Sequence, residues 1–435
     1  MGVVEVPGVG MTATGWACRV CGATLPISTP FPWRCPNSTD HDRHHVLAIV
    51  ETDAAIPHHT PTTIGPHDDP YLTYDQRFAW SAFAAAHGFD ADARSELVGE
   101  LDGAIADVSG VGFAPTPFGR SDRLSDELGF AGGGGIWVKD ETGGVAGSHK
   151  ARHLFTILLH LVAAERLGLI DERPPLAIAS CGNAALAAAT LARAAEWPID
   201  VYVPTWMTDA VGDELDRLGA RTHRCERRAA DPPGDPAMLR FREAIGDGAV
   251  PFTVQGPENA LALDGGRTIG WEIADQSGAL GVELDRVVVQ VGGGAFAACV
   301  GASLPVPLQT VQAAGCAPLA RAWERAGDDI LGGPTVLGRR WGELMTAWHD
   351  PRSIADGILD DETYDWLGIV AATDGRRDAP IVAAESDIVS AHRLARSAGF
   401  DVSPTGSAGL AGVLAIVDLV EPTERIAVIM SGIAR

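Results

Sequence analysis

Residues 176–195 read LAIASCGNAALAAATLARAA, which is a short apolar run, a turn of small polar residues and an alanine-rich stretch. The run Leu176–Ala179 has no polar alternation, which is typical of a strand that is buried on both faces of a parallel sheet. Alanine has the highest helix propensity, so a helix is expected to follow and to run to about Ala195. This strand–turn–helix unit predicts an α/β fold whose ligands bind at the carboxyl ends of the strands.

The same alternation continues on both sides of this unit. Further apolar runs and helical spacings predict strands at 136–138, 200–204, 287–291 and 426–430, and helices at 75–110, 151–162 and 209–219. Residues 51–80 are rich in Pro, His, Thr and Asp without a clear period, so we interpret them as a linker or wrapping segment. With 435 residues, the chain is long enough for two domains.

Composition limits the classes of partner. The formal net charge is −24 and the pI is near 4.8, which argues against nucleic acid and anionic membrane surfaces, because both are bound by basic faces. No apolar stretch of 18 residues appears, so no membrane-spanning helix is expected. The N-terminal residues lack the basic and apolar regions of a signal peptide. We therefore expect a protein of the cytoplasm, and the acidic composition by itself indicates no particular chemistry.

Three of the seven cysteines lie close together near the N-terminus. Cys18 and Cys21 have the spacing of one zinc-ribbon knuckle, and Cys35 with a nearby histidine can supply the other half. The candidate histidines are His41, His44 and His45, and we assign the fourth position to His41. A second Cys-x2-Cys is missing, so a degenerate knuckle without metal is the alternative. In either case residues 1–50 are interpreted as an accessory, zinc-ribbon-like module. If the knuckle is intact, a structural zinc is its expected metal.

The chain has only two lysines among its 33 basic residues, Lys139 and Lys150. Lys150 ends the segment AGSHK and opens a predicted helix, where burial and the positive helix end disfavour the charged amine. A neutral lysine amine is the group that forms Schiff bases with carbonyl cofactors. For Lys139, a surface ion pair with Asp140 or Glu141 is the simpler interpretation.

Three more loops follow predicted strands. The turn SCGN at 180–183 can hold a carboxylate at a helix start, although a plain N-cap turn fits it too. The glycine cluster at 292–294 can cradle a phosphate through backbone N–H groups, or form only a tight turn. Ser431 follows the last strand and can hydrogen-bond a ring nitrogen. Together with Lys150, these features suit one cofactor, pyridoxal 5′-phosphate.

The order and spacing of these motifs resemble the fold-type II pyridoxal-phosphate-dependent enzymes, the tryptophan synthase β-like superfamily. The resemblance covers roughly residues 112–435 and includes PTPF (115–118), KDE (139–141), GSHK, SCGNAALA, DGGRTIGWEI (264–273), VGGGAF, SIADGI (353–358), the run 386–412 and VIMSG. It implies two open, mostly parallel sheets with helices on both faces. It also implies a large cofactor-binding domain made of 51–150 and 265–435, a smaller mobile α/β domain at 151–264, and a homodimer.

The resemblance also implies a role for each site residue. Lys150 is the catalytic residue, which forms the Schiff base and carries the proton. The other cofactor-binding residues are expected to be Asn183, Gly292, Gly293, Gly294, Ala295, Phe296 and Ser431. The substrate-binding residues are expected to be Ser148, Ser180, Cys181, Gly182 and Asn183. A serine beside the ring nitrogen, in place of a carboxylate, favours elimination over transamination.

The motifs are closest to threonine synthase and to serine/threonine dehydratase. SCGNAALA, DGGRT and the cysteine cluster resemble threonine synthase, but that enzyme's usual Phe-Lys-Asp-Arg is replaced here by His149-Lys150-Ala151-Arg152. We therefore expect a lyase or synthase that catalyses elimination or replacement on a small amino acid, either threonine synthase-like or ammonia-lyase-like. A biosynthetic β-replacement of the cysteine synthase or tryptophan synthase β type is the alternative. A non-catalytic, cofactor-binding homologue is a remote one.

Overall fold

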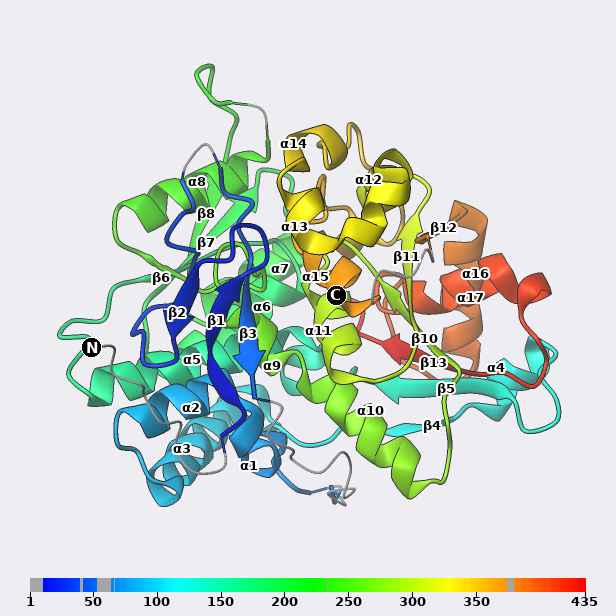
Figure 1. Cartoon of the computed structure of the whole chain (residues 1–435), viewed down its shortest axis with the longest axis horizontal. Helices are drawn as coiled ribbons and strands as arrows, with labels where there is room; N and C mark the ends of the chain where they lie inside the picture. The colour runs from blue at the N-terminus through cyan, green and yellow to red at the C-terminus, as the bar shows by residue number, and fades with distance from the viewer. Residues whose placement is uncertain (1–10, 40–41, 53–63, 66, 233, 374–378) are drawn as a thin grey trace. The chain divides into compact units, whose positions relative to one another are not determined.

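The computed structural model describes residues 11–39, 42–52, 64–65, 67–232, 234–373 and 379–435 (Figure 1). The chain forms two compact units. The small-sheet unit comprises Met1–Thr60, His67–Ala114 and Lys150–Gly265, and the large-sheet unit comprises Pro61–Pro66, Pro115–His149 and Gly266–Arg435. The units change at Lys150 and Gly265, but residues 67–114 group with the small sheet and not with the large domain to which we had assigned them.

The large-sheet unit is built on a six-stranded sheet of order β12-β11-β10-β13-β5-β4. All neighbouring strands are parallel except β4, which is antiparallel to β5. In chain order the strands are β4 (Phe118–Arg120), β5 (Gly135–Asp140), β10 (Arg286–Gln290), β11 (Leu308–Ala313), β12 (Ile381–Ala383) and β13 (Arg425–Met430). Three consecutive valines of β10, at 287–289, are fully buried, so both faces of the sheet are covered at its centre.

The helices of this unit pack on the sheet and on each other. Helices α11 and α17 both contact β10 and β11, and α16 contacts α17. The bounds are α4 (Asp122–Glu127), α10 (Thr268–Ala279), α11 (Ala295–Ser303), α12 (Pro318–Ala326), α13 (Gly333–Gly338), α14 (Trp341–Leu344), α15 (Trp366–Ala372), α16 (Glu385–Ser397) and α17 (Ala408–Ile416).

The small-sheet unit contains a four-stranded parallel sheet of order β8-β7-β6-β9. Its strands are β6 (Leu176–Ala179), β7 (Ile199–Pro204), β8 (Arg221–Cys225) and β9 (Val250–Pro251). Its helices are α1 (Pro70–Thr73), α2 (Ala79–Ala86), α3 (Ala91–Ser109), α5 (Lys150–Arg166), α6 (Asn183–Ala194), α7 (Asp209–Arg217), α8 (Pro236–Gly246) and α9 (Ala262–Gly265). Helices α6 and α8 both pack on β6, α3 packs on α6, and α2 packs on α5. These last two contacts explain why residues 67–114 belong to this unit.

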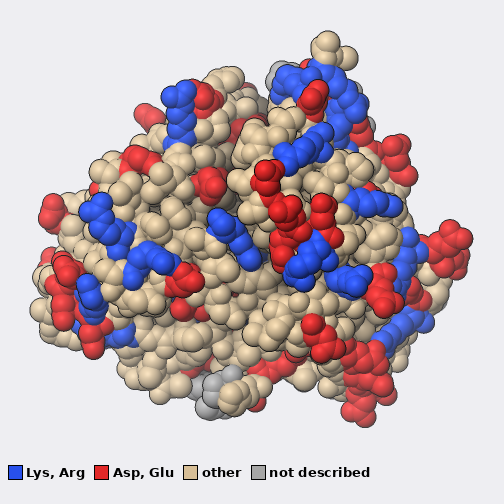
Figure 2. All heavy atoms as spheres, turned by 180° about the vertical axis from the view of Figure 1, so that it is seen from behind, with Lys and Arg blue, Asp and Glu red and all other residues tan. Residues whose placement is uncertain are grey.

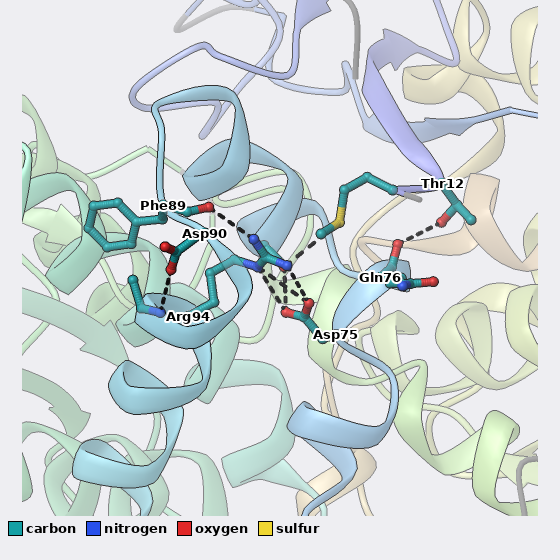
Figure 3. A network of polar contacts seen from close by, with 9 residues as sticks. Thr12, Asp75, Gln76, Phe89, Asp90 and Arg94 are labelled. Atoms are coloured by element: carbon teal, nitrogen blue, oxygen red, sulfur yellow. Dashed lines mark hydrogen bonds and ion pairs between the residues drawn. The ribbon is translucent and has the colours of Figure 1, made fainter. Parts of the chain in front are cut away.

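The stretch 75–110, for which the sequence predicts one helical region, is divided into two helices. Gly88 has a positive φ of +94° after α2, and the side chain of Asp90 caps α3 by accepting from the Ala93 N–H at 2.9 Å. The guanidinium of Arg94 in α3 then binds the carboxylate of Asp75 and the Phe89 carbonyl (Figure 3). This partly buried ion pair fixes α3 against the segment that precedes α2.

The N-terminal residues form a third, antiparallel sheet of order β2-β1-β3. Its strands are β1 (Ala13–Cys18), β2 (Thr24–Pro26) and β3 (Leu47–Glu51). Thr12 binds the Gln76 carbonyl through both its N–H (3.0 Å) and its hydroxyl (Figure 3). The module is thereby anchored to the body of the small-sheet unit.

The predicted α/β class with two mostly parallel sheets is confirmed. The run 176–179 is β6 as predicted, and the other predicted strands differ from β5, β7, β10 and β13 by one or two residues at an end. Within the described residues, no helix combines the length and the apolar character that a membrane span requires.

Candidate active site

The loop that carries Lys150 is held in an uncommon backbone conformation. Ala146 and Gly147 both have positive φ angles, +52° and +66°. A side chain at 147 would collide with Ile433, since an added Cβ lies 2.6 Å from its Cδ1. A non-glycine residue in the left-handed region costs energy that the surrounding structure must supply, and such strain is concentrated at functional sites. The loop therefore has a fixed shape before Lys150 begins α5.

The large-sheet unit brings three of the four predicted motifs together. The Ser431 carbonyl accepts hydrogen bonds from the His149 N–H (3.1 Å) and from its Nδ1 (3.0 Å). Ser148 forms a bridge with Gly432, and the His149 ring stacks on Phe296 at 4.1 Å between centroids. Residues 147–149 of the GSHK segment, the glycine loop and the end of the last strand thus form one packed structure within this unit.

The glycine loop has the geometry of an anion cradle. Gly294 has a φ of +98° and precedes α11, whose start is capped by no side chain. A Cβ at Gly294 would lie 2.8 Å from Thr363 Cγ2, and one at Gly292 would collide with the Asp360 carboxylate. The loop therefore excludes side chains, and the helix presents its N–H groups and positive end to a ligand. This arrangement fits a phosphate.

A second observation supports a bound polar group in this unit. The Ser148 hydroxyl is buried, and it has no hydrogen-bond partner within the part of the chain that the structure describes. Leaving a buried hydroxyl unsatisfied costs about 1–3 kcal/mol, so a ligand atom is the natural partner. The residues present are therefore suited to pyridoxal phosphate.

Ser431 is positioned by a residue that the sequence did not single out. The Gln290 Nε2 donates to Ser431 Oγ at 2.8 Å and to the Gly406 carbonyl at 2.9 Å. Because the hydroxyl oxygen accepts from Gln290, its own proton is left to be donated elsewhere. The signal for Gln290 was a polar residue at the end of the buried run VVVQ, directly before the glycine loop.

The small-sheet unit holds Lys150 and the SCGN turn. Lys150 is the first residue of α5 and is half-buried, and Asn183 is the first residue of α6. Among the described residues no side chain caps α6, and residues 180–183 are only partly buried, so the turn is accessible to a carboxylate. Burial, and to a lesser degree the charge of Lys150, lower the pKa of His153 in α5 to about 3. His153 therefore adds no positive charge beside Lys150 at neutral pH.

Lys139 is not a surface residue. Its Nζ is fully buried, forms an ion pair with Glu272 at 2.5 Å and donates to the Thr116 carbonyl at 2.7 Å. The expected surface position is therefore wrong, and the ion pair that the structure shows is formed with Glu272. The interpretation relied on the acidic residues next to Lys139 in sequence. Glu272 lies 133 residues away in α10, so no local pattern could indicate it. Lys139 joins β5 to α10 and is a structural residue.

The N-terminal cysteines converge with a histidine. Within the described residues, Cys18, Cys21, Cys35 and His45 place their ligand atoms within 4.8 Å of one another. The backbone N–H of Asn37 points at the sulfur of Cys35, and its side-chain amide points at that of Cys21. His41, to which we had assigned the fourth position, lies outside the described residues.

The surroundings of this cluster fit zinc. The His45 Nδ1 is 3.5 Å from Cys18 Sγ, while its Nε2 is 3.1 Å from the Asp42 carboxylate. A carboxylate that binds the outer nitrogen of a histidine is the usual support of a metal ligand. Three thiols and one imidazole are a common tetrahedral zinc set, and the two S–N and S–S distances of 3.5 Å suit ligands on one ion.

Comparison with known proteins agrees with this site. The family profile described as "Pyridoxal-phosphate dependent enzyme" matches residues 111–432. Threonine synthase from Methanosarcina acetivorans is 25% identical over 317 residues, which cover 70% of this chain and 70% of that protein.

Two solved structures have the same fold. Threonine deaminase isoform 2 from Solanum lycopersicum has a TM-score of 0.58 and 19% identity, and the match covers 80% of this chain and 92% of that one. The threonine deaminase from T.th. also has a TM-score of 0.58, with 22% identity and coverage of 78% and 98%. The sheets, the glycine loop and the lysine loop thus define the class of fold-type II pyridoxal-phosphate enzymes. The chain belongs to the pyridoxal-phosphate-dependent enzyme family, so the predicted cofactor and enzyme class are confirmed.

Proposed function

We propose that the enzyme catalyses elimination on a small, unphosphorylated hydroxyamino acid and releases ammonia and a 2-oxo acid. When bound, pyridoxal phosphate supplies the electron sink that makes the substrate Cα–H acidic. Lys150 Nζ takes this proton, and the SCGN turn holds the substrate carboxylate. The glycine loop anchors the phosphate.

The observation that carries the proposal is the Gln290–Ser431 hydrogen bond. It orients the Ser431 hydroxyl to donate its proton to a ring nitrogen that stays uncharged. A neutral nitrogen gives a weaker electron sink than a pyridinium, which disfavours transamination relative to loss of a β-substituent.

The segment around the lysine favours a substrate without phosphate. The usual threonine synthase sequence Phe-Lys-Asp-Arg is replaced here by His149-Lys150-Ala151-Arg152, and the loss of the Asp weakens the case for a phosphohomoserine substrate. Threonine synthase-like chemistry remains a second candidate, because the threonine synthase from Methanosarcina acetivorans matches 70% of the chain.

A screen of substrates tests the proposal. Purified holoenzyme is incubated with L-serine, L-threonine, O-phospho-L-homoserine and O-acetyl-L-serine, and 2-oxo acid, ammonia and phosphate are measured. We expect 2-oxo acid and ammonia in equal amounts from serine or threonine. Phosphate release with threonine formation would instead establish the second candidate, and no turnover of any of these compounds would contradict both.

A substitution at Ser431 tests its role beside the cofactor ring. Ser431→Asp is expected to protonate the ring nitrogen, to produce a long-wavelength absorption band near about 500 nm and to raise transamination relative to elimination. Ser431→Ala is expected to be milder, since it removes one hydrogen bond worth about 1 kcal/mol. The spectrum and the ratio of the two products are measured with one substrate. Unchanged values in Ser431→Asp would show that Ser431 does not face the ring.

We also propose one structural zinc at Cys18, Cys21, Cys35 and His45, and a cytoplasmic homodimer. The zinc proposal rests on the convergence of the four ligand atoms and on the Asp42 contact to His45. Native mass spectrometry of the purified protein tests both the metal and the dimer.

A further inference from the structure

A pocket of about 850 Å³ lies within the small-sheet unit, between α8 and the strands β7 and β8. It contains none of the predicted cofactor or substrate residues. It is lined by charged, aromatic and small apolar side chains: Pro174, Pro175, Asp200, Tyr202, His223, Arg224, Cys225, Glu226, Arg227, Arg228, Arg240, Glu243, Ala244, Asp247, Gly248 and Ala249. A volume of this size is in the range of small-molecule sites.

Four arginines line this pocket, and two of them bind backbone carbonyls. Arg224 donates to the carbonyls of Thr205 (2.8 Å) and Met207 (3.1 Å), and Arg227 donates to the Pro232 carbonyl at 3.1 Å. Arg224 also lies 3.7 Å from the carboxylate of the exposed Asp209, a weak surface pair. Carbonyl groups fix the position of a guanidinium without cancelling its charge. Basic side chains also gather around the loop after β8 in the small-sheet unit (Figure 2), although the whole chain has a net charge of −24.

Two of the three guanidinium nitrogens of Arg240 in α8 lack acceptors within the described residues. Its side chain is 9% exposed, and its Nη2 binds Asp231 at 2.5 Å and Glu243 at 3.0 Å. Its Nε and Nη1 are buried and have no hydrogen-bond partner in the part of the chain that the structure describes. A buried donor without an acceptor loses its hydrogen bonds to water and gains none in return, which is unfavourable. A ligand oxygen that reaches this guanidinium, after a small turn of the side chain, removes that cost.

Two of the acidic residues that line the pocket, Asp200 and Glu243, form ion pairs with basic side chains. Asp200 accepts from Arg221 at 2.9 and 2.6 Å and contacts His223 at 2.7 Å. Glu243 lies between Arg228 (3.4 Å) and Arg240. Glu226 and Asp247 also line the pocket and limit how much negative charge it accepts. These pairs leave Arg224, Arg227 and the open edge of Arg240 as the main donors.

A second wall of the pocket suits an organic group. The rings of Tyr202 and His223 are stacked, with centroids 4.9 Å apart and planes 15° apart. Asp200 holds His223 in this position. Pro174 and Pro175 add apolar surface. A planar or carbon-rich group packs well on such a surface.

We propose that this pocket is a second ligand site, separate from the catalytic one, for a small phosphorylated organic molecule. A carboxylate is satisfied by one guanidinium, whereas a phosphate group offers three oxygens to the several guanidiniums that line this pocket. The phosphate binds the arginines, and the organic part packs on the Tyr202–His223 wall. The pocket is distinct from the phosphate cradle at the glycine loop, which lies in the other unit.

Binding to the holoenzyme, freed of excess cofactor, tests the proposal. Isothermal titration is carried out with adenosine 5′-monophosphate, glucose 6-phosphate and inorganic phosphate as probes. We expect one equivalent of a phosphorylated organic probe per chain, with an affinity that weakens as salt increases. The double variant Arg227→Ser/Arg228→Ser is expected to weaken binding by about tenfold or more, because charge-assisted bonds to phosphate are lost.

The matched control is Arg217→Ser in α7. Arg217 is an exposed arginine of the same unit, paired with Glu214 and absent from the pocket lining, so binding is expected to be unchanged. His223→Ala is expected to weaken the organic probes more than inorganic phosphate, because it removes half of the stacked wall. Absence of binding of all three probes at millimolar concentration would overturn the proposal. The proposal would also be overturned if the double variant bound the probes as tightly as the wild type, or if the pocket bound amino acids that carry only a carboxylate and no phosphorylated probe.

Discussion

Lys150→Ala is expected to lose all turnover and the absorption band of the cofactor's Schiff base near about 410–420 nm. Without the amine there is neither a covalent anchor for the cofactor nor a base for the substrate Cα proton. A loss of about four orders of magnitude or more in kcat is expected, since general base catalysis alone contributes about 10²–10⁴-fold. The measurement is an absorption spectrum of the purified variant and its rate with the substrate that the screen identifies.

The scarcity of lysine makes the control simple. The wild-type holoenzyme is reduced with borohydride, digested and mapped, and the pyridoxyl group is expected on Lys150 and not on Lys139. Lys139→Ala cannot serve as a neutral control, because it leaves Glu272 buried without its cation, which costs about 3–5 kcal/mol. A pyridoxyl group found on Lys139 would contradict the assignment.

The large features of the fold could be predicted because they depend on local patterns. Residues 176–178 of β6 are buried although their side chains point to alternate faces of the sheet, and apolar residues without alternation are the direct signature of that environment. Positions 292 and 294 require glycine because Asp360 and Thr363 occupy the space of a side chain. A lack of space for side chains in a loop is visible in the sequence, because it leaves a cluster of glycines directly after a strand.

Other features depend on contacts between distant segments, which no local pattern reveals. Glu272 neutralises Lys139 from α10, and Gln290 binds Ser431 across 141 residues. The assignment of 67–114 to the large domain failed for the same reason. The apolar faces of α2 and α3 show that these helices are packed, but not that their partners are α5 and α6.

The zinc-ribbon module contains one feature that a local pattern predicts and one that depends on the folded structure. The spacing of Cys18 and Cys21 is a local signal, and the structure brings Cys35 to them. The fourth ligand is different, because spacing alone does not distinguish His41, His44 and His45. The strand that follows indicates which described histidine is the candidate fourth ligand. Val46 and Leu47 are buried where the chain enters β3, and this packing places His45 against Cys18.

Cys35→Ser is expected to release the zinc and to lower the stability of the small-sheet unit by at least about 3 kcal/mol. Structural zinc contributes about 10–16 kcal/mol of binding free energy in small zinc modules, and that energy is coupled to folding. For a unit of this size we expect the unfolding temperature to fall by about 5–10 °C. Metal content is measured by elemental analysis, and unfolding by calorimetry with and without a chelator.

Cys299→Ala is the matched control, because Cys299 is a buried thiol of α11 in the other unit. It is expected to keep one zinc per chain and to lose only the packing of one side chain. Protein purified without chelator that contains no zinc, or a Cys35→Ser variant with wild-type stability, would show that the four residues form a knuckle without metal.

The effect of zinc is expected to extend to the helix that begins at Lys150. The segment between Cys21 and Cys35 contacts the body of the unit: the Pro30 carbonyl is 2.6 Å from His160 Nε2 in α5, and the Trp33 carbonyl accepts from the Ala260 N–H at 3.0 Å. Arg34 also pairs with the buried Glu258. Because the cluster fixes both ends of this segment, loss of the metal frees contacts that hold α5. Chelation is therefore expected to increase hydrogen exchange in α5 as well as in β1–β3, whereas exchange confined to residues 11–52 would show that the module is energetically independent of the catalytic lysine.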